Sequence, residues 1–194
     1  MCSRPTHAIK RRRRQLSNAE EFERLARIVS DMLFLAKSEN DLVVPNRGPV
    51  SLGDEVRSVL EFYEALAEEN GIMVALEGEG SIAGDRLMIR RAINNLVSNA
   101  VRHTTPGGTV TVRILGDRGS GTELQVENAG EGIAAEHLPR LFDRFYRVDF
   151  ARQRQSEGAG LGLAITRSIV RAHGGEAAVH LANGLSTFCL KFPD

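Results

Sequence analysis

Two asparagines and an arginine stand at helical spacing in residues 89–103 and carry groups that can bind a metal–phosphate ligand. At about 100° per residue, Asn95, Asn99 and Arg102 share one polar face beside an apolar stripe. The stripe consists of Ile89, Ile93, Leu96 and Ala100. Asparagine is a mediocre helix former, but its amide oxygen suits a hard cation such as Mg²⁺, and arginine suits phosphate. The pattern predicts a metal–nucleotide site and leaves a solvated helix face open as the alternative.

Two glycine clusters lie further along the chain. The first, Gly130 and Gly132, follows a predicted strand, and such a pair lets a planar or anionic ligand approach the backbone closely. The second, in residues 158–163, stands at the start of a predicted helix, where free N–H groups and the helix dipole favour phosphate. It is not a P-loop, because no Gly-Lys-Ser/Thr follows, and it lacks the context of a dinucleotide fingerprint. Each cluster alone is also typical of a tight turn.

The segment between the two clusters carries arginines and aromatic residues. Residues 141–147 read LFDRFYR, and Arg152 and Arg154 follow. An arginine-bearing segment between glycine hinges predicts a lid over a charged ligand. The aromatic residues of the same segment would anchor the base of that lid in the core.

Upstream, residues 18–40 predict a helix with Glu20 and Glu21 placed well for its dipole. We expect order to begin near Ser17 or Asn18. The apolar residues of this helix have the spacing of a coiled coil or helical bundle. They are Phe22, Leu25, Val29, Met32 and Ala36. Two heptads do not distinguish a homodimer seam from a helix laid on the adjacent domain.

Residues 47–194 predict one α+β domain. Ser51 would cap a helix that Gly71 ends, and Asp85 would open the helix that carries Asn95 and Asn99. Further runs predict strands at 72–76, 81–83, 109–115, 123–127, 175–182 and 186–192, and a last helix at 160–173. Helices and antiparallel strands without strict βαβ alternation predict a two-layer α/β sandwich, with the helices on one face of the sheet.

Charge is distributed unevenly along the chain. The 25 basic and 25 acidic residues cancel, but residues 1–16 hold six basic residues and no acidic one. The overall balance argues against a nucleic-acid partner, and no apolar run approaches the ~18 residues that a membrane span needs. Cys2 and Cys189 are too few for a disulfide framework or a CxxC zinc site. We expect a disordered basic leader at 1–16, a bundle helix and linker at 17–46, and the domain at 47–194.

The order of these motifs resembles the N, G1, F and G2 boxes of sensor histidine kinases, over about residues 50–194. Those kinases have the ATPase fold shared with DNA gyrase, Hsp90 and MutL. The upstream helix resembles the second helix of the kinase dimerisation bundle. Residues 30–36 and 138–149 look most like copper- and silver-responsive sensor kinases. The resemblance implies an ATP-dependent histidine protein kinase that uses Mg²⁺.

The resemblance also implies roles for individual residues. Asn99 would bind Mg²⁺, with Asn95 and Arg102 toward the phosphates, and these three would be the catalytic residues. His103 would lie near the nucleotide, and Asn128 would read the adenine amino group. The other implied nucleotide contacts are Gly130, Gly132, Ile133, Arg147, Gly158, Ala159, Gly160, Leu161, Gly162 and Leu163.

Three positions depart from the family's pattern. Asn128 stands where the family usually has aspartate, but its amide oxygen still accepts a hydrogen bond, so we expect weakened or unchanged adenine recognition. Leu185 and Ser186 replace a frequent Gly-Thr pair, which we interpret as a tolerated surface change. None of the five histidines has the acidic-then-proline context of a phosphoacceptor. The first bundle helix is absent too, so we expect residues 1–15 to be a replacement, a frameshifted start or a truncation scar.

Three functions follow as hypotheses. The first is the cytoplasmic ATP-binding part of a sensor kinase that resembles inner-membrane sensors. Its partners would be the histidine-bearing dimerisation domain of a kinase chain and a response regulator. The second is an anti-sigma-type serine kinase, which the upstream helix disfavours. The third is a non-catalytic fragment that binds nucleotide or a partner, which the missing phosphoacceptor favours.

Overall fold

A five-stranded sheet, in the order β2-β4-β5-β7-β6, forms one layer of the computed structural model. The structure describes residues 6–38, 43–117, 121–130, 132–148 and 159–194, with side chains from Glu21 onward. The strands are β2 Met73–Glu77, β4 Thr109–Asp117, β5 Gly121–Ala129, β6 Glu176–Ala182 and β7 Leu185–Phe192. All neighbours pair antiparallel except β2 and β4, which run parallel.

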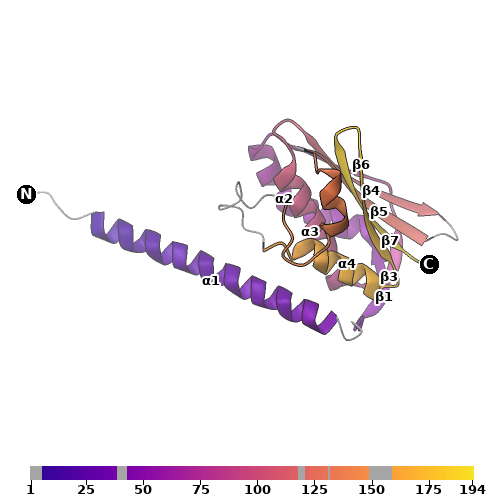
Figure 1. The fold of residues 1–194 in the computed structure, drawn as a ribbon, viewed down its shortest axis with the longest axis horizontal. Coiled ribbons are helices and arrows are strands. Elements are labelled where there is room, and N and C mark those ends of the chain that lie inside the picture. Colours follow the sequence, from indigo (N-terminus) through magenta and orange to yellow (C-terminus); the bar gives the residue numbers. More distant parts are fainter. Residues whose placement is uncertain (1–5, 39–42, 118–120, 131, 149–158) are drawn as a thin grey trace, which may run out of the picture.

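Three helices cover one face of this sheet and form the second layer (Figure 1). They are α2 Leu52–Glu69, α3 Arg86–His103 and α4 Gly162–Ala172, with α3 between the other two. A separate two-stranded sheet pairs β1 Arg47–Ser51 with β3 Ser81–Asp85. The core lies between the layers and includes Leu52, Ile89, Ile93, Leu96, Leu124, Val126, Ile165, Ile169 and Leu190. The predicted α+β two-layer fold is confirmed.

The predicted helix ends have their physical causes in the structure. The Ser51 side chain accepts a hydrogen bond from the Asp54 N–H at 3.3 Å, at the start of α2. Gly71, just past the end of that helix, has φ +66°, a conformation that glycine adopts at no steric cost. The Asp85 carboxylate accepts from the N–H groups of Leu87 and Met88 and so caps α3.

Two parts of the structure differ from the sequence prediction. Helix α1 spans Thr6–Ser38, so its backbone begins within the predicted leader and not near Ser17. Residues 7–37 contain no proline or glycine and are rich in good helix formers, so nothing local stops a helix that is anchored further along. Strand β1 lies at the start of the predicted domain, where the sequence predicts no strand, and contains Pro49, which an edge strand tolerates because its free side needs no N–H donor.

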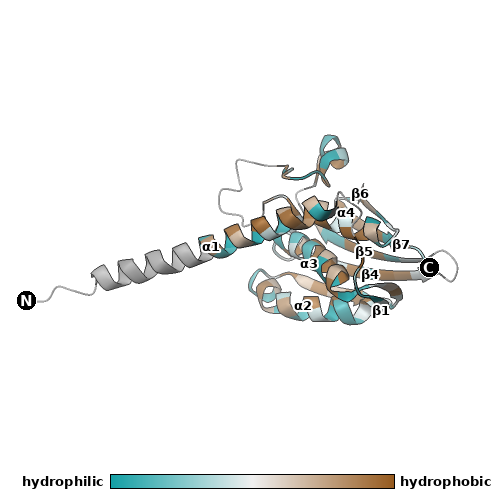
Figure 2. Cartoon of the chain, turned by 90° about the horizontal axis from the view of Figure 1, so that it is seen from below, coloured by the Kyte–Doolittle hydropathy of each residue, from teal (hydrophilic) through white to brown (hydrophobic). Residues whose placement is uncertain are grey.

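The C-terminal third of α1 packs on the sandwich, whereas its N-terminal part points away from it (Figure 1). Leu35 is 2% exposed and belongs to the core. Asp31 pairs with Arg91 of α3, and the Arg91 guanidinium lies 4.5 Å from the centre of the Phe34 ring. The predicted seam residues lie on the other face of α1, where apolar and polar residues alternate (Figure 2). Those seam residues, Phe22, Leu25, Val29 and Met32, are exposed.

A buried carboxylate fastens α2 to α3. The Glu55 side chain is 3% exposed, and its two oxygens accept hydrogen bonds from Arg86 and Arg90. Burial alone would raise the pKa of Glu55, but the two guanidinium hydrogen bonds and charges outweigh burial and lower it. Because the folded-state pKa is lowered, the ionised carboxylate stabilises the fold above its unfolded pKa. That contribution is lost as the pH falls through the folded value.

We therefore predict that Glu55→Gln lowers the free energy of unfolding by about 1–3 kcal/mol at pH 7. The deficit should begin to shrink below the ordinary glutamate pKa of 4.5 and should vanish only below the lowered pKa of folded Glu55, where the wild-type side chain is neutral as well. Urea denaturation at pH 7 and at acidic pH measures both. Glu61→Gln, an exposed change on the same helix, is the matched control. A deficit that does not depend on pH would contradict the prediction.

Candidate functional site

Asn95 joins α3 to the second glycine cluster. Its side-chain nitrogen donates a hydrogen bond to the carbonyl oxygen of Gly162 at 3.1 Å, across 67 positions of the sequence. The Thr166 hydroxyl donates to the same carbonyl oxygen at 3.0 Å. A Cβ on Gly162 would lie 3.5 Å from the Asn95 side chain. The asparagine-bearing helix and the second glycine cluster are therefore in direct contact.

Asn99 and Arg102 continue along α3 from this contact. Asn99 is half-buried, and no side chain that the structure describes forms a hydrogen bond with its amide. Its amide oxygen is available to a hard cation. Arg102 is exposed, and its nearest partner is the Ser98 hydroxyl at 3.5 Å, a contact that leaves most of its donors in solvent.

The start of α4 has the properties of an anion site. Leu161 precedes the helix and provides no side-chain cap, so within the described part of the chain no N-cap side chain meets the first N–H groups of α4. Unfilled N–H groups at a helix N-terminus attract negative charge. Leu161 is 1% exposed and holds this end of α4 in the core, while Ala159 and Leu163 are half-buried beside it. Gly158, predicted to belong to the same cluster, lies outside the described residues.

The first glycine turn is built against the end of α3. Thr104 forms an isolated antiparallel bridge with Gly130, and the Thr105 N–H donates to the Ala129 carbonyl at 3.3 Å. A Cβ on Gly130 would lie 2.4 Å from the carbonyl oxygen of His103, so only glycine fits there without movement. Gly132 has φ +35° and open space around it. Ile133, next in the chain, is half-buried against the core.

Asn128 is the buried polar residue of this turn. It follows Leu124 and Val126 in the alternation of β5, so it lies on the helix-facing side of the sheet, and it is 4% exposed. No side-chain hydrogen bond of Asn128 exists among the described residues. Since no fully buried side-chain nitrogen or oxygen of the described residues lacks a partner, the amide must touch solvent.

Ser186 pairs directly with Asn128 across β5 and β7. It is 7% exposed, so our interpretation of this position as a surface change is wrong. The alternation of the strand could have predicted this burial. Ser186 lies on the same face of β7 as Phe188, Leu190 and Phe192, which are all buried. Ser186 is the site residue that sequence reasoning missed.

Positive charge gathers where the lid segment meets α3. The pKa of His103 is lowered first by burial of the ring, which nevertheless keeps an exposed edge, and then by the charges of Arg102 and Arg147. The charge of Arg147 therefore reaches the end of α3, although Arg147 comes from the lid segment. The positive charge of these two guanidinium groups suits an anion at the end of α3.

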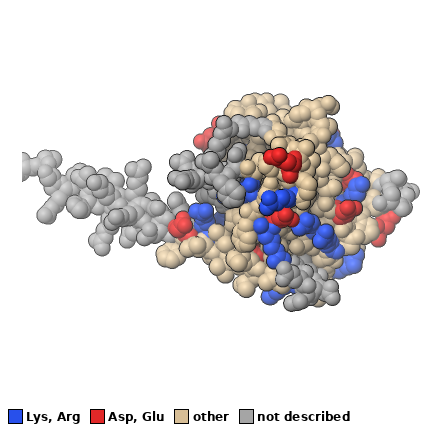
Figure 3. All heavy atoms as spheres, viewed as in Figure 1, with Lys and Arg blue, Asp and Glu red and all other residues tan. Residues whose placement is uncertain are grey.

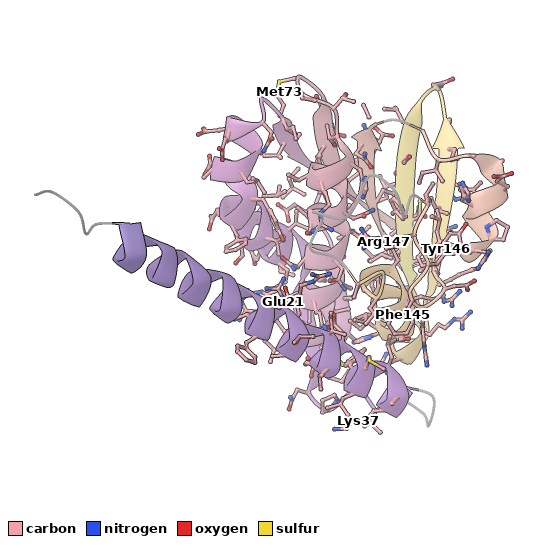
Figure 4. The ribbon with its side chains drawn as sticks, turned by 60° about the vertical axis from the view of Figure 1, so that its left-hand side comes forward. Glu21, Lys37, Met73, Phe145, Tyr146 and Arg147 are labelled. Carbon is pink, nitrogen blue, oxygen red and sulfur yellow. The ribbon has the colours of Figure 1, made fainter. Side chains whose placement is uncertain are left out.

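Phe145 and Tyr146 of the lid segment contact the second glycine cluster. The Phe145 N–H donates to the Gly160 carbonyl at 2.9 Å, and a Cβ on Gly160 would lie 3.0 Å from the backbone of Phe145 and Tyr146. Phe145 has φ +62°, which is rare for a bulky residue. The Tyr146 hydroxyl lies 2.7 Å from Nδ1 of His137, which sits in the short 3-10 helix η1 Ala135–Arg140. Figure 4 shows Phe145, Tyr146 and Arg147 in succession beside α4.

Basic side chains also gather on the outer surface of α4 and the lid base (Figure 3). Arg140 and Arg167 both approach the Asp143 carboxylate, at 3.8 and 3.9 Å. Burial and the charges of Arg171 and Arg144 lower the pKa of Arg167. The predicted lid arginines Arg152 and Arg154 lie outside the described residues.

The comparisons with known proteins agree with this geometry. Residues 84–194 match the family described as histidine kinase-, DNA gyrase B-, and HSP90-like ATPase. The sensor histidine kinase CusS of Escherichia coli O157:H7 is 53% identical over 84% of this chain and 34% of its own length. The probable sensor kinase SilS of Salmonella typhimurium is 44% identical over 91% of this chain and 36% of its own length. The chain belongs to the histidine kinase-, DNA gyrase B- and HSP90-like ATPases.

This ATPase spans about a third of the length of the curated relatives that it matches. The solved structure of the histidine kinase AdeS of Acinetobacter baumannii has the same fold, with a TM-score of 0.78 at 23% identity, over 98% of this chain and 86% of that one. The resemblance to sensor histidine kinases is confirmed. Among the described residues, no helix is long and apolar enough to cross a membrane.

Within this ATPase, the predicted residues form two adjoining groups. Asn95 lies against Gly162, with Asn99 and Arg102 following along α3. Gly130, with the Asn128–Ser186 pair beside it, lies at the C-terminal end of α3, close to His103. No cluster of three or more acidic, histidine or cysteine side chains exists among the described residues, so a divalent ion would depend on amide oxygens and on phosphate.

Proposed function

We propose that this chain binds Mg²⁺·ATP and transfers the γ-phosphoryl group to a histidine on the dimerisation domain of a kinase chain. The observation that carries the proposal is the contact of Asn95 with Gly162, which sets the asparagine face of α3 against the uncapped start of α4. Phosphoryl transfer depends on such positioning and on charge neutralisation more than on covalent chemistry by the protein.

The described residues fit such a ligand by their chemistry. Asn99 would bind Mg²⁺ through its amide oxygen, with Asn95 beside it, and the ion would neutralise phosphate charge. Arg102 and Arg147 would hold the phosphates, and the first N–H groups of α4, with Gly160 and Gly162, would surround them. Asn128 would contact the base, and the base would lie against Gly130 and Gly132 of the first turn. A neutral His103 would add no further charge to this wall.

The partners and compartment follow from the relatives. We propose that the phosphorylated histidine passes its phosphoryl group to a response regulator, as the similarity to sensor histidine kinases implies. The resemblance to copper- and silver-responsive kinases extends the proposal to metal-responsive signalling. The parent would be an inner-membrane sensor with this part in the cytoplasm. The domain bounds stay a proposal as well: a basic leader at residues 1–16, a bundle helix with its linker at 17–46, and the domain at 47–194.

We further propose that the exposed seam of α1 forms a homodimer contact within residues 18–40, because the opposite face of the helix is already used by the sandwich. Sedimentation equilibrium should show a concentration-dependent dimer, and Leu25→Asp should abolish it by placing a charge in the seam. Glu23→Lys, an exposed polar change beside the seam, is the control. A wild-type chain that stays monomeric at all concentrations would exclude the contact.

Replacement of Asn99 by alanine should weaken ATP binding at least ten-fold in the presence of Mg²⁺ and have little effect without it, because an oxygen ligand of the ion is lost. Calorimetric titration of ATP with and without Mg²⁺ measures this. Asn94→Ala is the matched control, since Asn94 stands on the same helix but accepts a hydrogen bond from Tyr63 of α2. The proposal fails if ATP binding does not depend on Mg²⁺ or if Asn99→Ala binds like wild type.

The residue that receives the phosphoryl group distinguishes the three hypotheses: a histidine kinase, a serine kinase and a non-catalytic fragment. Mixed with ATP and a kinase-dead bundle that bears a phosphoacceptor histidine, this chain should form an acid-labile phosphoprotein. An acid-stable product on a protein partner would indicate a serine kinase instead. Nucleotide binding with no phosphorylated product would indicate a non-catalytic fragment. The histidine-to-alanine bundle serves as the control, and phosphorylation of that variant would also contradict the proposal.

A further inference from the structure

We propose that the base site of this chain accepts 6-oxopurine nucleoside triphosphates, such as inosine triphosphate, about as well as ATP, and that Asn128 is the residue responsible. The inference rests on the proposed nucleotide site and extends it to the choice of base. It comes from three features of Asn128: a buried amide that has no partner among the described residues, the ability of an amide both to donate and to accept, and the identity of its neighbours in the sheet.

The first feature is a polar side chain that is almost fully buried and whose hydrogen-bonding capacity is not used by the described residues. Asn128 is 4% exposed, yet its amide makes no hydrogen bond with a residue that the structure describes and keeps contact with solvent. Its amide nitrogen lies 3.3 Å from the place that a Cβ on Gly130 would take, so the amide points along the glycine turn. A buried polar group of this kind is costly unless a ligand or water satisfies it.

The second feature is the two-sided chemistry of an amide. The oxygen accepts and the nitrogen donates, and rotation by half a turn about the last side-chain bond exchanges them. Adenine presents a donor, its 6-amino group, beside an acceptor ring nitrogen. A 6-oxopurine presents the reverse order, a carbonyl acceptor beside a ring N–H donor. Both edges can therefore pair with one amide through two hydrogen bonds, in its two orientations.

The third feature is that the cross-strand neighbours do not hold the amide in one orientation. Val110 of β4 and Ser186 of β7 stand opposite Asn128 in the sheet. Valine offers no hydrogen bond, and the serine hydroxyl both donates and accepts. Neither neighbour carries a charge. An ionised carboxylate at position 128 would only accept, and it would repel the carbonyl oxygen of a 6-oxopurine.

The test compares the affinities of ATP and inosine triphosphate for the full chain with Mg²⁺, by calorimetric titration. Inosine triphosphate differs from ATP only at the edge in question and adds no bulk. We expect the two dissociation constants of the wild-type chain to lie within ten-fold of each other. Asn128→Asp should keep ATP binding and raise the ratio at least ten-fold, since a lost pair of base contacts costs about that much or more. Asn183→Asp, the same chemical change at an exposed turn, should leave the ratio unchanged.

The outcomes separate this inference from the proposed function. If the wild-type chain binds ATP and discriminates ten-fold or more against inosine triphosphate, the inference is overturned and the proposed function stands. A ratio that Asn128→Asp leaves unchanged overturns it as well. If Asn128→Asp does not fold, as judged by circular dichroism, the wild-type ratio alone decides. Failure of both nucleotides to bind the folded wild-type chain overturns the nucleotide site itself, and this inference with it.

Discussion

The fixed packing of α3 against α4 is the constraint on which the rest of the site depends. At one end, the buried His173 ring accepts a hydrogen bond from the Asp85 N–H at 3.0 Å and donates one to the Ile169 carbonyl at 2.7 Å. At the other end, Asn95 donates to Gly162. Two polar contacts at opposite ends of an apolar interface allow neither sliding nor rotation. The uncapped start of α4 therefore stays beside the asparagine face of α3.

Helix α3 and the lid segment both contact α1, which lies outside the sandwich. Arg91, one turn before Asn95, pairs with Asp31 and stacks on Phe34 of α1. Arg144, three positions before Arg147, donates to the Leu35 carbonyl at 3.4 Å. Helix α1 thus contacts both walls of the proposed nucleotide site, the α3 wall and the lid base. A change in the position of α1 would act on both walls, and by reciprocity a ligand between them would act on α1.

The site relies on amides where many metal–nucleotide sites use carboxylates. Asn95, Asn99 and Asn128 carry no charge, so they can be buried or half-buried without the penalty of an unpaired carboxylate. The carboxylate of Glu55, in contrast, is buried only because two guanidinium groups meet it. Burial of the ring first, and then the charges of Arg102 and Arg147, lower the pKa of the neighbouring His103. The charge of these two arginines would favour phosphate in the proposed site, whereas the amides would contribute hydrogen bonds and no charge.

Much of the fold could be predicted from local pattern. The Ser51 and Asp85 caps, the stop at Gly71 and the strand periods gave the helices and strands of the sandwich, because these signals act within a few residues. Strand β1 was missed because its five residues include Pro49 and pair only with β3, a partner distant in sequence. The predicted start of α1 was wrong because the run of basic residues was interpreted as disordered. Arginine is in fact a good helix former, and the helix begins at Thr6.

The sequence by itself determined which side chains are the candidates for the chemistry: the amides of α3, the two glycine clusters and the arginines of the lid segment. Only the tertiary structure decided which of them meet. It set Gly162 against Asn95, His103 against Gly130, and Ser186 opposite Asn128. Residue types and helical spacing are local properties, whereas the register of β5 with β7 and the packing of α4 on α3 arise from burial of apolar surface between segments far apart in the chain.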